Sequence, residues 1–197
     1  MIKIGEMKIF KTVVILILVL GVAGAGFFWT KNSLLKTNRV EGSSAAPSLA
    51  PTAQPTPDYP KTVGDFLVTD KEIEKENGKP AVYFFGSSTC PHCVWEKPIA
   101  KKVFDQFKDQ IVYHENFDSE ADAEVFNRYA DINPGYVPFL ILGGKYARMG
   151  AGENLGSTEE ESKKLEEQAL TAILCKLTEG KPTTVCAKVQ ESTAQIP

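Results

Sequence analysis

The stretch FFGSSTCPHCVWEKP, residues 84–98, joins an apolar run to a loop with two cysteines and then to a segment of helical character. Residues 81–85 (AVYFF) are all apolar or aromatic, and such residues favour a β-strand. The run is broken at once by residues 86–89 (GSST), which is a turn signal. We therefore predict a buried strand that ends in an exposed turn directly before Cys90.

Cys90 and Cys93 are separated by two residues, so their sulfur atoms can meet if a helix begins between them. Pro91 suits the first position of that helix, because its missing N–H group costs no hydrogen bond there. Unpaired N–H groups at a helix amino end stabilise an anion, which predicts a readily ionised, exposed thiol at Cys90. Cys93 is then the resolving partner, and His92 could add a donor or a positive charge beside the Cys90 sulfur. A stabilised thiolate favours the reduced form and makes the pair a stronger oxidant.

The amino-terminal region carries a short basic segment, residues 1–11, followed by an apolar segment, residues 12–30. Residues 12–29 contain no charged side chain. A helix over them would be about 27 Å long, close to the roughly 30 Å of bilayer hydrocarbon. We predict a single transmembrane anchor here. The alternative is a cleaved signal peptide, since residues 23–25 (AGA) resemble a cleavage site.

Residues 31–60 form a linker rich in Pro, Ser and Ala, which cannot bury a core and is expected to be semi-extended. Residues 61–197 are long enough for one globular domain. The chain has 22 Lys and Arg against 25 Asp and Glu, and six of the basic residues precede Val40. The remainder is therefore acidic, which argues against nucleic acid or anionic lipid as a ligand.

The globular part alternates strand and helix patterns, after residues 62–68, which fit either a first strand or an extended lead-in. We predict strands at residues 81–85, 111–117, 136–142 and 145–149, the last two joined by the hairpin signal Gly143-Gly144. We predict helices at residues 70–77, 91–108 and 119–130 (capped by Ser119 or Asp118), and a long helix that begins at Ser157 or Thr158 and ends before Gly180. The apolar face of the second helix is expected to contain Val94, Ile99, Val103, Phe104 and Phe107. This order predicts an α/β fold in which a parallel strand pair is joined to an antiparallel pair.

These features together resemble the thioredoxin superfamily. The resemblance depends on the apolar strand, the Cys-Pro-His-Cys loop, Pro98 inside the following helix, and the dipeptide Val137-Pro138. It covers roughly residues 62–180 and implies a thioredoxin-like fold.

The same resemblance implies roles for individual residues. Cys90 and Cys93 would be the catalytic redox pair. Val137 and Pro138 would form a cis-proline loop, in which the residue before the proline offers backbone hydrogen bonds to a substrate chain.

The dipeptide Pro91-His92 is similar to that of DsbA-type disulfide oxidases, so both residues are expected to modulate the active site. One position departs from the superfamily, which usually buries a proton-relaying acid in the strand six positions before the first cysteine. Here that residue is Phe84. Proton transfer to Cys93 would then need water or another group.

Cys175 and Cys186 enclose ten residues across the end of the last predicted helix. In an exported domain the simplest interpretation is a structural disulfide. A second redox relay, or a zinc site shared with the other two cysteines, are the alternatives. We expect neither a metal nor a cofactor, because the paired short-spacing motif that zinc usually needs is missing. His114 is expected to be an ordinary strand residue.

The favoured functional hypothesis is a membrane-tethered thiol-disulfide oxidoreductase that acts on exported proteins. Its domain would face the periplasm or the outer side of the cell membrane, where thiols are not kept reduced. His92 favours an oxidant, and a reductant is the alternative within this class. The resemblance also implies reoxidation by a quinone-linked membrane partner of the DsbB or vitamin K epoxide reductase type. The second hypothesis is a non-catalytic module that binds a peptide beside Pro138, or a soft metal through Cys90, Cys93 and His92.

Overall fold

The structure, a computed structural model, describes residues 58–197. The predicted basic segment (1–11), the predicted anchor (12–30) and nearly all of the predicted linker (31–60) lie outside the described residues. Among residues 58–197, no helix combines the length and the apolar character needed to span a membrane. The predicted globular part, residues 61–197, is described in full.

The central strand is β3 (Lys79–Gly86), which contains the apolar run that the sequence marks as a strand. It pairs in parallel with β4 (Val112–Phe117) and antiparallel with β5 (Phe139–Leu142). β5 pairs antiparallel with β6 (Tyr146–Met149), and β6 with β1 (Leu67–Val68). The predicted α/β class is confirmed, and so is the combination of a parallel pair with an antiparallel pair.

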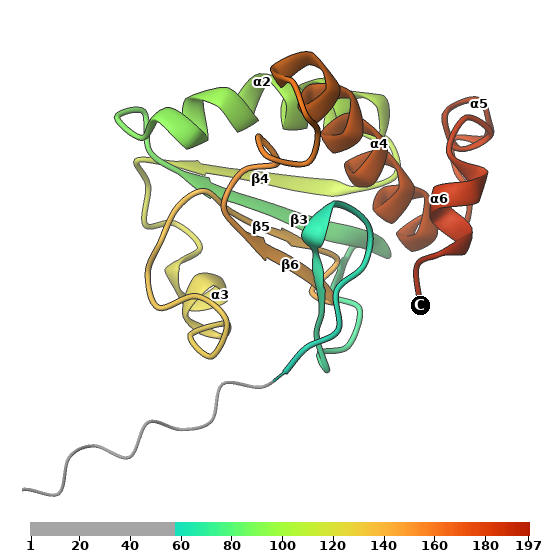
Figure 1. Cartoon of the computed structure of the whole chain (residues 1–197). Helices are drawn as coiled ribbons and strands as arrows, with labels where there is room; N and C mark the ends of the chain where they lie inside the picture. Colours follow the sequence, from blue (N-terminus) through green and yellow to red (C-terminus); the bar gives the residue numbers. More distant parts are fainter. Residues whose placement is uncertain (1–57) are drawn as a thin grey trace, which may run out of the picture. The chain divides into compact units, whose positions relative to one another are not determined.

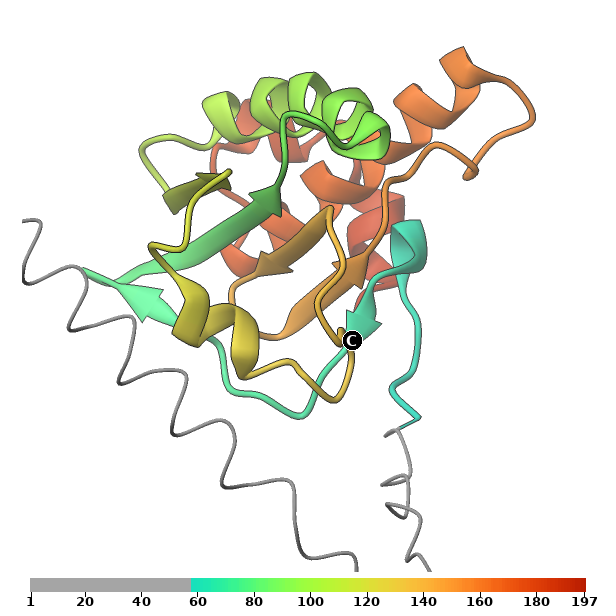
Figure 2. The same ribbon diagram turned by 90° about the vertical axis from the view of Figure 1, so that its left-hand side faces the viewer.

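Helices cover both faces of this sheet. They are α2 (Pro91–Gln106), α3 (Ala123–Asn127), α4 (Glu159–Leu177), α5 (Thr183–Cys186) and α6 (Gln190–Ala194), with a short 3-10 helix η1 (Val63–Asp65) before β1. α2 and α4 lie on one face and α3 on the other (Figures 1 and 2). α5 and α6 pack against α4 near the carboxyl terminus (Figure 1).

Alternate side chains of β3 enter two separate cores. Val82 and Phe84 join the core under α2 and α4. Tyr83 and Phe85 join the smaller core beside α3. Because successive side chains of a strand point to opposite faces, a strand covered on both sides needs a continuous apolar run. The two cores therefore explain why the run in β3 does not alternate with polar residues.

Helix α2 begins at Pro91, as predicted. Its buried face includes Ile99, Val103 and Phe104, also as predicted. Val94 is an error in the prediction, since its side chain is 55% exposed. It lies at helical spacing from Pro98, on the exposed side of the helix, where no core residue can meet it.

The predicted helix over residues 70–77 is wrong. This segment contains β2 (Lys75–Glu76), which forms a hairpin with the start of β3. The turn is Asn77-Gly78, and both residues have positive φ values, 51° and 78°. Asn-Gly is the strongest short hairpin signal, because both residues tolerate this conformation. The charged residues of the segment resemble an exposed helix, but they supply no apolar face that a helix could bury.

The predicted helix over residues 119–130 is also too long, since α3 spans only Ala123–Asn127. Its N-cap is Asp122, which makes no capping hydrogen bond through its side chain. The expected cap Asp118 instead ends β4 with a φ of 50° and binds the turn before Cys90. A left-handed residue does not continue into a helix, so α3 begins only after a turn at residues 121–122.

The long carboxyl-terminal helix α4 is confirmed, and of the two expected caps it uses Thr158. The Thr158 hydroxyl accepts a hydrogen bond from the Glu161 N–H at 3.1 Å. The Glu161 carboxylate accepts one from the Ser157 N–H at 2.7 Å. This reciprocal arrangement satisfies N–H groups that the helix itself leaves unpaired.

Candidate functional site

Cys90 lies between the end of β3 and the first residue of α2. It is the N-cap of that helix, and its Sγ accepts a hydrogen bond from the Cys93 N–H at 3.3 Å. The first turn of α2 contains no acidic residue. The amino end of a helix carries partial positive charge, and the Cys90 sulfur lies at that end of α2.

Cys93 lies one turn inward and is fully buried, whereas Cys90 is partly exposed. Both are free thiols in the structure. Burial raises the pKa of the Cys93 thiol to about 12, and its hydrogen bond with Cys90 adds to the shift. Cys93 is therefore protonated at neutral pH, and Cys90 is the sulfur that another molecule can reach.

The loop before β5 brings Val137 to the same place. The Val137 carbonyl oxygen lies 3.6 Å from the Cys90 Sγ, and the Val137-Pro138 peptide bond is cis. Pro138 directly precedes β5, whose antiparallel pairing with β3 carries the loop to the active-site end of β3. The structure thus gathers Cys90, Cys93 and Val137, which lie far apart in the sequence.

Asn133 holds this loop in place and was not singled out in the sequence. Its buried side chain donates to the Tyr136 carbonyl at 2.8 Å and accepts from the N–H groups of Gly135 and Tyr136 at 3.1 and 2.7 Å. The sequence Asn-Pro-Gly is a turn signal that could have indicated such a role. Tyr136 itself is 64% exposed beside Val137.

Asp118 fastens the turn on the other side of Cys90. Its carboxylate accepts hydrogen bonds from the Ser88 N–H at 3.2 Å and the Ser87 hydroxyl at 2.8 Å. Hydrogen bonds from Ser88 and Ser87 lower the pKa of Asp118. The parallel pairing of β3 with β4 brings these residues together, because both strands end at the same edge of the sheet.

A cluster of buried charges lies beneath the start of α2. Arg148 of β6 makes two hydrogen bonds to the Glu166 carboxylate of α4, at 2.6 and 2.7 Å. Its Nη2 also lies 3.3 Å from the Glu96 Oε2 of α2. Both glutamate side chains are fully buried, and only 5% of the arginine side chain is exposed. One guanidinium therefore faces two carboxyl groups inside the protein.

This imbalance affects Glu96 most. Burial raises the pKa of the Glu96 carboxyl well above its usual range, and the charge of Glu166 adds to the shift, although Arg148 opposes it. The Glu96 Oε1 atom has no hydrogen-bond partner among the described residues. Glu96 therefore keeps a proton to higher pH than an ordinary glutamate. The sequence placed Glu96 next to the active turn without indicating this burial, because an isolated charged residue in a helix is usually solvated.

Phe84, which occupies the position of the expected acid, lies in the core under α2 and α4. Its ring meets the Phe117 ring edge to face at 5.0 Å. No carboxyl group therefore reaches the site from β3 at this position.

His92, which is expected to modulate the site together with Pro91, is exposed at the first turn of α2. Its Nδ1 lies 2.6 Å from the Glu153 Oε1 of the loop between β6 and α4. The loop that carries Glu153 is rich in glycine. In the structure it packs against α2, since the Gly152 N–H donates to the Glu96 Oε2 at 3.0 Å.

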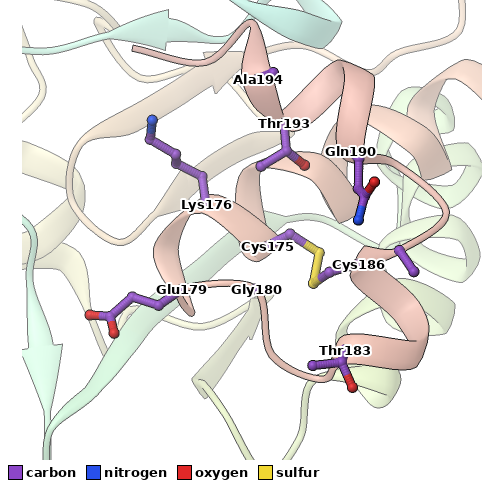
Figure 3. Close-up of a pocket in the computed structure, with 10 residues that line it drawn as sticks. Cys175, Lys176, Glu179, Gly180, Thr183, Cys186, Gln190, Thr193 and Ala194 are labelled. Atoms are coloured by element: carbon purple, nitrogen blue, oxygen red, sulfur yellow. A yellow bond between two sulfur atoms is a disulfide. The ribbon is translucent and has the colours of Figure 1, made fainter.

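The second cysteine pair is separate from this site. Cys175 and Cys186 form the predicted disulfide, which joins the end of α4 to α5 (Figure 3). A pocket of about 470 Å³ lies beside the bond. Figure 3 shows Lys176, Glu179, Thr183 and Gln190 around it. This pocket contains no free thiol, because both of its cysteines are bonded.

His114 lies in β4, as predicted, away from Cys90. Its ring stacks on that of Tyr83 at 4.6 Å, and its Nε2 lies 2.8 Å from the Glu76 Oε1. Within residues 58–197 no group of three or more His, Cys, Asp or Glu side chains is arranged to hold a metal ion.

Comparison with known proteins adds no assignment: no protein-family model and no curated protein matches the chain.

Proposed function

We propose that residues 61–197 form a thioredoxin-like domain and that the chain is a thiol-disulfide oxidoreductase of exported proteins. The arrangement of β3, α2, β4 and the β5–β6 hairpin supports the fold, since the two cysteines stand between the central strand and its following helix. The chemistry of the cysteine pair supports the activity.

One observation carries this proposal. The Cys90 Sγ accepts the N–H of Cys93 at the amino end of α2, while the Cys93 thiol is buried one turn inward. The Cys90 sulfur can attack a sulfur atom of another molecule, or such an atom can attack it. The Cys93 sulfur follows three residues later and is shielded from that molecule by its burial. Such a division of roles is what a dithiol exchange site requires.

In the oxidised form, a substrate thiolate attacks the Cys90 Sγ. The bond between Cys90 and Cys93 breaks, its electron pair stays on the Cys93 sulfur, and that sulfur takes up a proton. The substrate is now joined to Cys90 by a mixed disulfide. A second substrate thiolate attacks the substrate sulfur of this bond and releases Cys90 as a thiolate. The substrate loses two electrons, and the cysteine pair gains them.

In the first step the released Cys93 sulfur takes up a proton and stays neutral in its buried position, because burial raises its pKa to about 12. The amino end of α2 fits the last step, because it stabilises the departing Cys90 thiolate. Stabilisation of that thiolate favours the reduced protein, and the domain therefore acts as an oxidant.

Val137 and Pro138 would hold the substrate chain. The Val137 carbonyl lies 3.6 Å from the Cys90 Sγ, so a peptide joined to Cys90 passes beside it. A backbone carbonyl in that place can accept a hydrogen bond from a substrate N–H group. Exposed Tyr136 offers an apolar contact next to it.

An oxidising compartment outside the cytoplasm suits this function. The disulfide between Cys175 and Cys186 supports such a location, since bonds of this kind persist mainly where thiols are not kept reduced. Residues 12–30 would provide the single membrane anchor. Repeated turnover needs an acceptor for two electrons, for which we propose a quinone-linked membrane partner.

The test is the reduction potential of the Cys90–Cys93 pair in the full chain, measured by equilibration with glutathione. If the pair is an oxidant, its reduction potential should be well above that of thioredoxin, which is about −270 mV, and nearer to the value of about −120 mV for DsbA. A value near that of thioredoxin would contradict the oxidant and favour a membrane-tethered reductant. A Cys93→Ser chain should accumulate mixed disulfides with its substrates, because the resolving sulfur is gone.

A second candidate is a non-catalytic module that binds peptides beside Pro138 or a soft metal through the two thiols and His92. The replacement of the expected acid by Phe84 favours this candidate, because it removes a proton relay. Oxidative refolding of a reduced protein separates the two functions. If the chain is a binding module, the wild type and the Cys90→Ser variant should give the same rate of oxidative refolding.

A further inference from the structure

A groove lies along the outer face of α2, next to the turn that carries Cys90. Its volume is about 380 Å³, and it is lined by residues of that turn, of α2 and of the end of β4, namely Ser88, Val94, Lys97, Pro98, Lys101 and Phe117. The Val94 N–H donates to the Cys90 carbonyl at 3.0 Å. The groove is therefore continuous with the place where exchange would occur.

The groove is apolar, although two lysines line it. Val94 is 55% exposed, and it is one of four large apolar side chains that are exposed in the described part of the chain. The Lys97 Nζ lies 2.7 Å from the Glu115 Oε1, and the Lys101 Nζ lies 2.9 Å from the Asp105 Oδ1. Because both ammonium groups already have partners, the two lysines contribute mainly their apolar stems.

The Phe117 ring forms a fixed wall of this groove. It meets the Phe84 ring edge to face at 5.0 Å, and the Lys97 Nζ lies 4.0 Å from its centroid. Gly86 pairs with Phe117 across β3 and β4, and a Cβ at Gly86 would collide with the ring. The ring can lie there because position 86 has no side chain. The wall thus exists before any partner binds, which lowers the cost of binding.

Pro98 gives the groove a polar group of the main chain. Proline has no N–H, so Pro98 cannot donate to the Val94 carbonyl four residues earlier, as another helical residue would. That oxygen can accept a hydrogen bond from the N–H of a bound chain. An apolar surface beside a main-chain acceptor suits a polypeptide with an apolar side chain.

The groove and Val137 lie on opposite sides of Cys90. β3 pairs on one side with β4, which ends at Phe117, and on the other side with β5, which follows Pro138. Cys90 comes after β3 and thus between the two. A substrate chain that passes the Val137 carbonyl and crosses Cys90 therefore reaches the groove with residues close to its own cysteine.

We propose that this groove binds an apolar side chain that lies within a few residues of the substrate's cysteine. This inference rests on the proposed exchange function and specifies its substrate class. Apolar residues are mostly buried in folded proteins, whereas unfolded chains expose them. The preferred substrates are therefore unfolded segments in which a cysteine has an apolar neighbour.

The experiment measures how fast single-cysteine peptides reduce the oxidised full-length chain. The reference peptide contains glycine and serine around the cysteine. In the test peptides one serine, two to four residues from the cysteine on either side, is replaced by phenylalanine. The residues next to the cysteine stay the same, so the reactivity of its thiol is constant. We expect at least one test peptide to react about five- to tenfold faster than the reference, because its ring is buried in the groove.

Two variants locate the effect. Val94→Ser should reduce the ratio of the two rates to about twofold or less. A ratio measured within one chain is independent of any change in the reactivity of Cys90. Ile73→Ser is the matched control, because it removes an apolar side chain that is 44% exposed elsewhere. Ile73 lies near the far end of β5, where the Glu74 N–H donates to the Gly143 carbonyl at 2.9 Å. This control should keep the ratio of wild type.

A ratio in Val94→Ser equal to that of wild type would overturn the inference. So would a wild-type dimer that Val94→Ser dissociates and that shows no peptide preference, since the groove would then hold a second copy of the chain. A wild-type chain that exchanges with neither glutathione nor any peptide would refute the proposed function as well. If it exchanged with glutathione but reacted equally fast with all the peptides, only this inference would be refuted.

Discussion

The two cysteine pairs of this chain occupy opposite ends of helices. Cys90 precedes α2 and accepts an N–H group, whereas Cys175 lies in the last turn of α4 and is bonded to Cys186. The amino end of a helix stabilises a thiolate, and the carboxyl end destabilises one. The same residue type is therefore a free thiol in one place and closed into a crosslink in the other.

The two regions are also held together differently. Hydrogen bonds to the Asp118 carboxylate hold the turn before Cys90, and hydrogen bonds with the Asn133 side chain hold the loop before β5. The buried cluster around Arg148 lies beneath the start of α2. The tail depends on a covalent bond between α4 and α5, which restricts the chain in the unfolded state as well. Substitutions should separate these two kinds of support.

The largest expected effect concerns exchange chemistry. Cys90→Ser should reduce the rate of disulfide exchange with glutathione by at least about 1,000-fold, because a serine hydroxyl is not ionised at neutral pH. The matched control is the double variant Cys175→Ser/Cys186→Ser, which should stay within about twofold of wild type since both residues lie away from the site. A comparable loss of exchange in the control would mean that the second pair also carries electrons.

The next largest effect concerns the buried cluster. Arg148→Leu should lower the free energy of unfolding by about 3–5 kcal/mol, because it leaves two buried carboxyl groups without their cation. Arg128→Leu is the control, since that side chain is 53% exposed and its ion pair with Glu74 should contribute at most about 1 kcal/mol. Urea unfolding of both full-length variants measures the difference. Equal losses would show that the cluster stabilises the fold no more than a surface pair.

Removal of the crosslink should have a smaller effect. Cys175→Ser/Cys186→Ser should lower the free energy of unfolding by somewhat under about 3 kcal/mol, because only a short loop is released in the unfolded chain. Reduced wild type should unfold at nearly the same urea concentration as this variant. If the loss exceeded that of Arg148→Leu, the tail would be the more critical of the two regions.

The last effect depends on pH, and it is small near pH 4, where Glu96 carries a proton in the folded and the unfolded chain. The pKa of Glu96 is raised on folding, so its contribution to stability is present below the pKa of an unfolded glutamate, about 4.3, and is lost as the pH rises toward the folded value. Glu96→Gln cannot ionise, and its stability relative to wild type should increase across that range by about 1 kcal/mol per pH unit.

Glu166→Gln is the matched control for this pH effect, because it replaces one of the two oxygens that accept from Arg148 by an amide NH2 group, which cannot accept, and should destabilise the protein. Urea unfolding between pH 4 and pH 8 follows both variants. A constant difference between Glu96→Gln and wild type over the whole range would show that Glu96 ionises like an exposed glutamate.

Local patterns predicted most of the elements. The apolar run of β3, Pro91 at the start of α2, the Gly143-Gly144 hairpin and Thr158 as the cap of α4 all depend on near neighbours in the chain. The errors were local as well. Asn77-Gly78 is a hairpin signal that was overlooked, and Asp118 resembles a helix cap but serves another turn.

The supporting residues of the site were harder to predict. The contacts of these residues join parts of the chain that are distant in sequence, as shown by Asp118, Glu153 and Arg148. The neighbouring residues in the sequence do not indicate which partner each one meets. Glu96 is three residues after Cys93, yet its burial depends on α4 and β6. A charged residue in a helix is indistinguishable from a solvated one until its neighbours are known.

Periodicity and spacing along the chain were enough to predict the α/β order of elements, the position of Cys90 at the start of a helix, and a bond between Cys175 and Cys186. Three contacts became visible only in the folded chain. The Val137 carbonyl lies beside Cys90, Glu153 faces His92, and Glu96 shares one cation with Glu166. The reason is physical. Contacts of this kind arise when strands and helices pack. Burial then shifts the pKa of a side chain, and the residues next to it in the chain do not show that it will be buried.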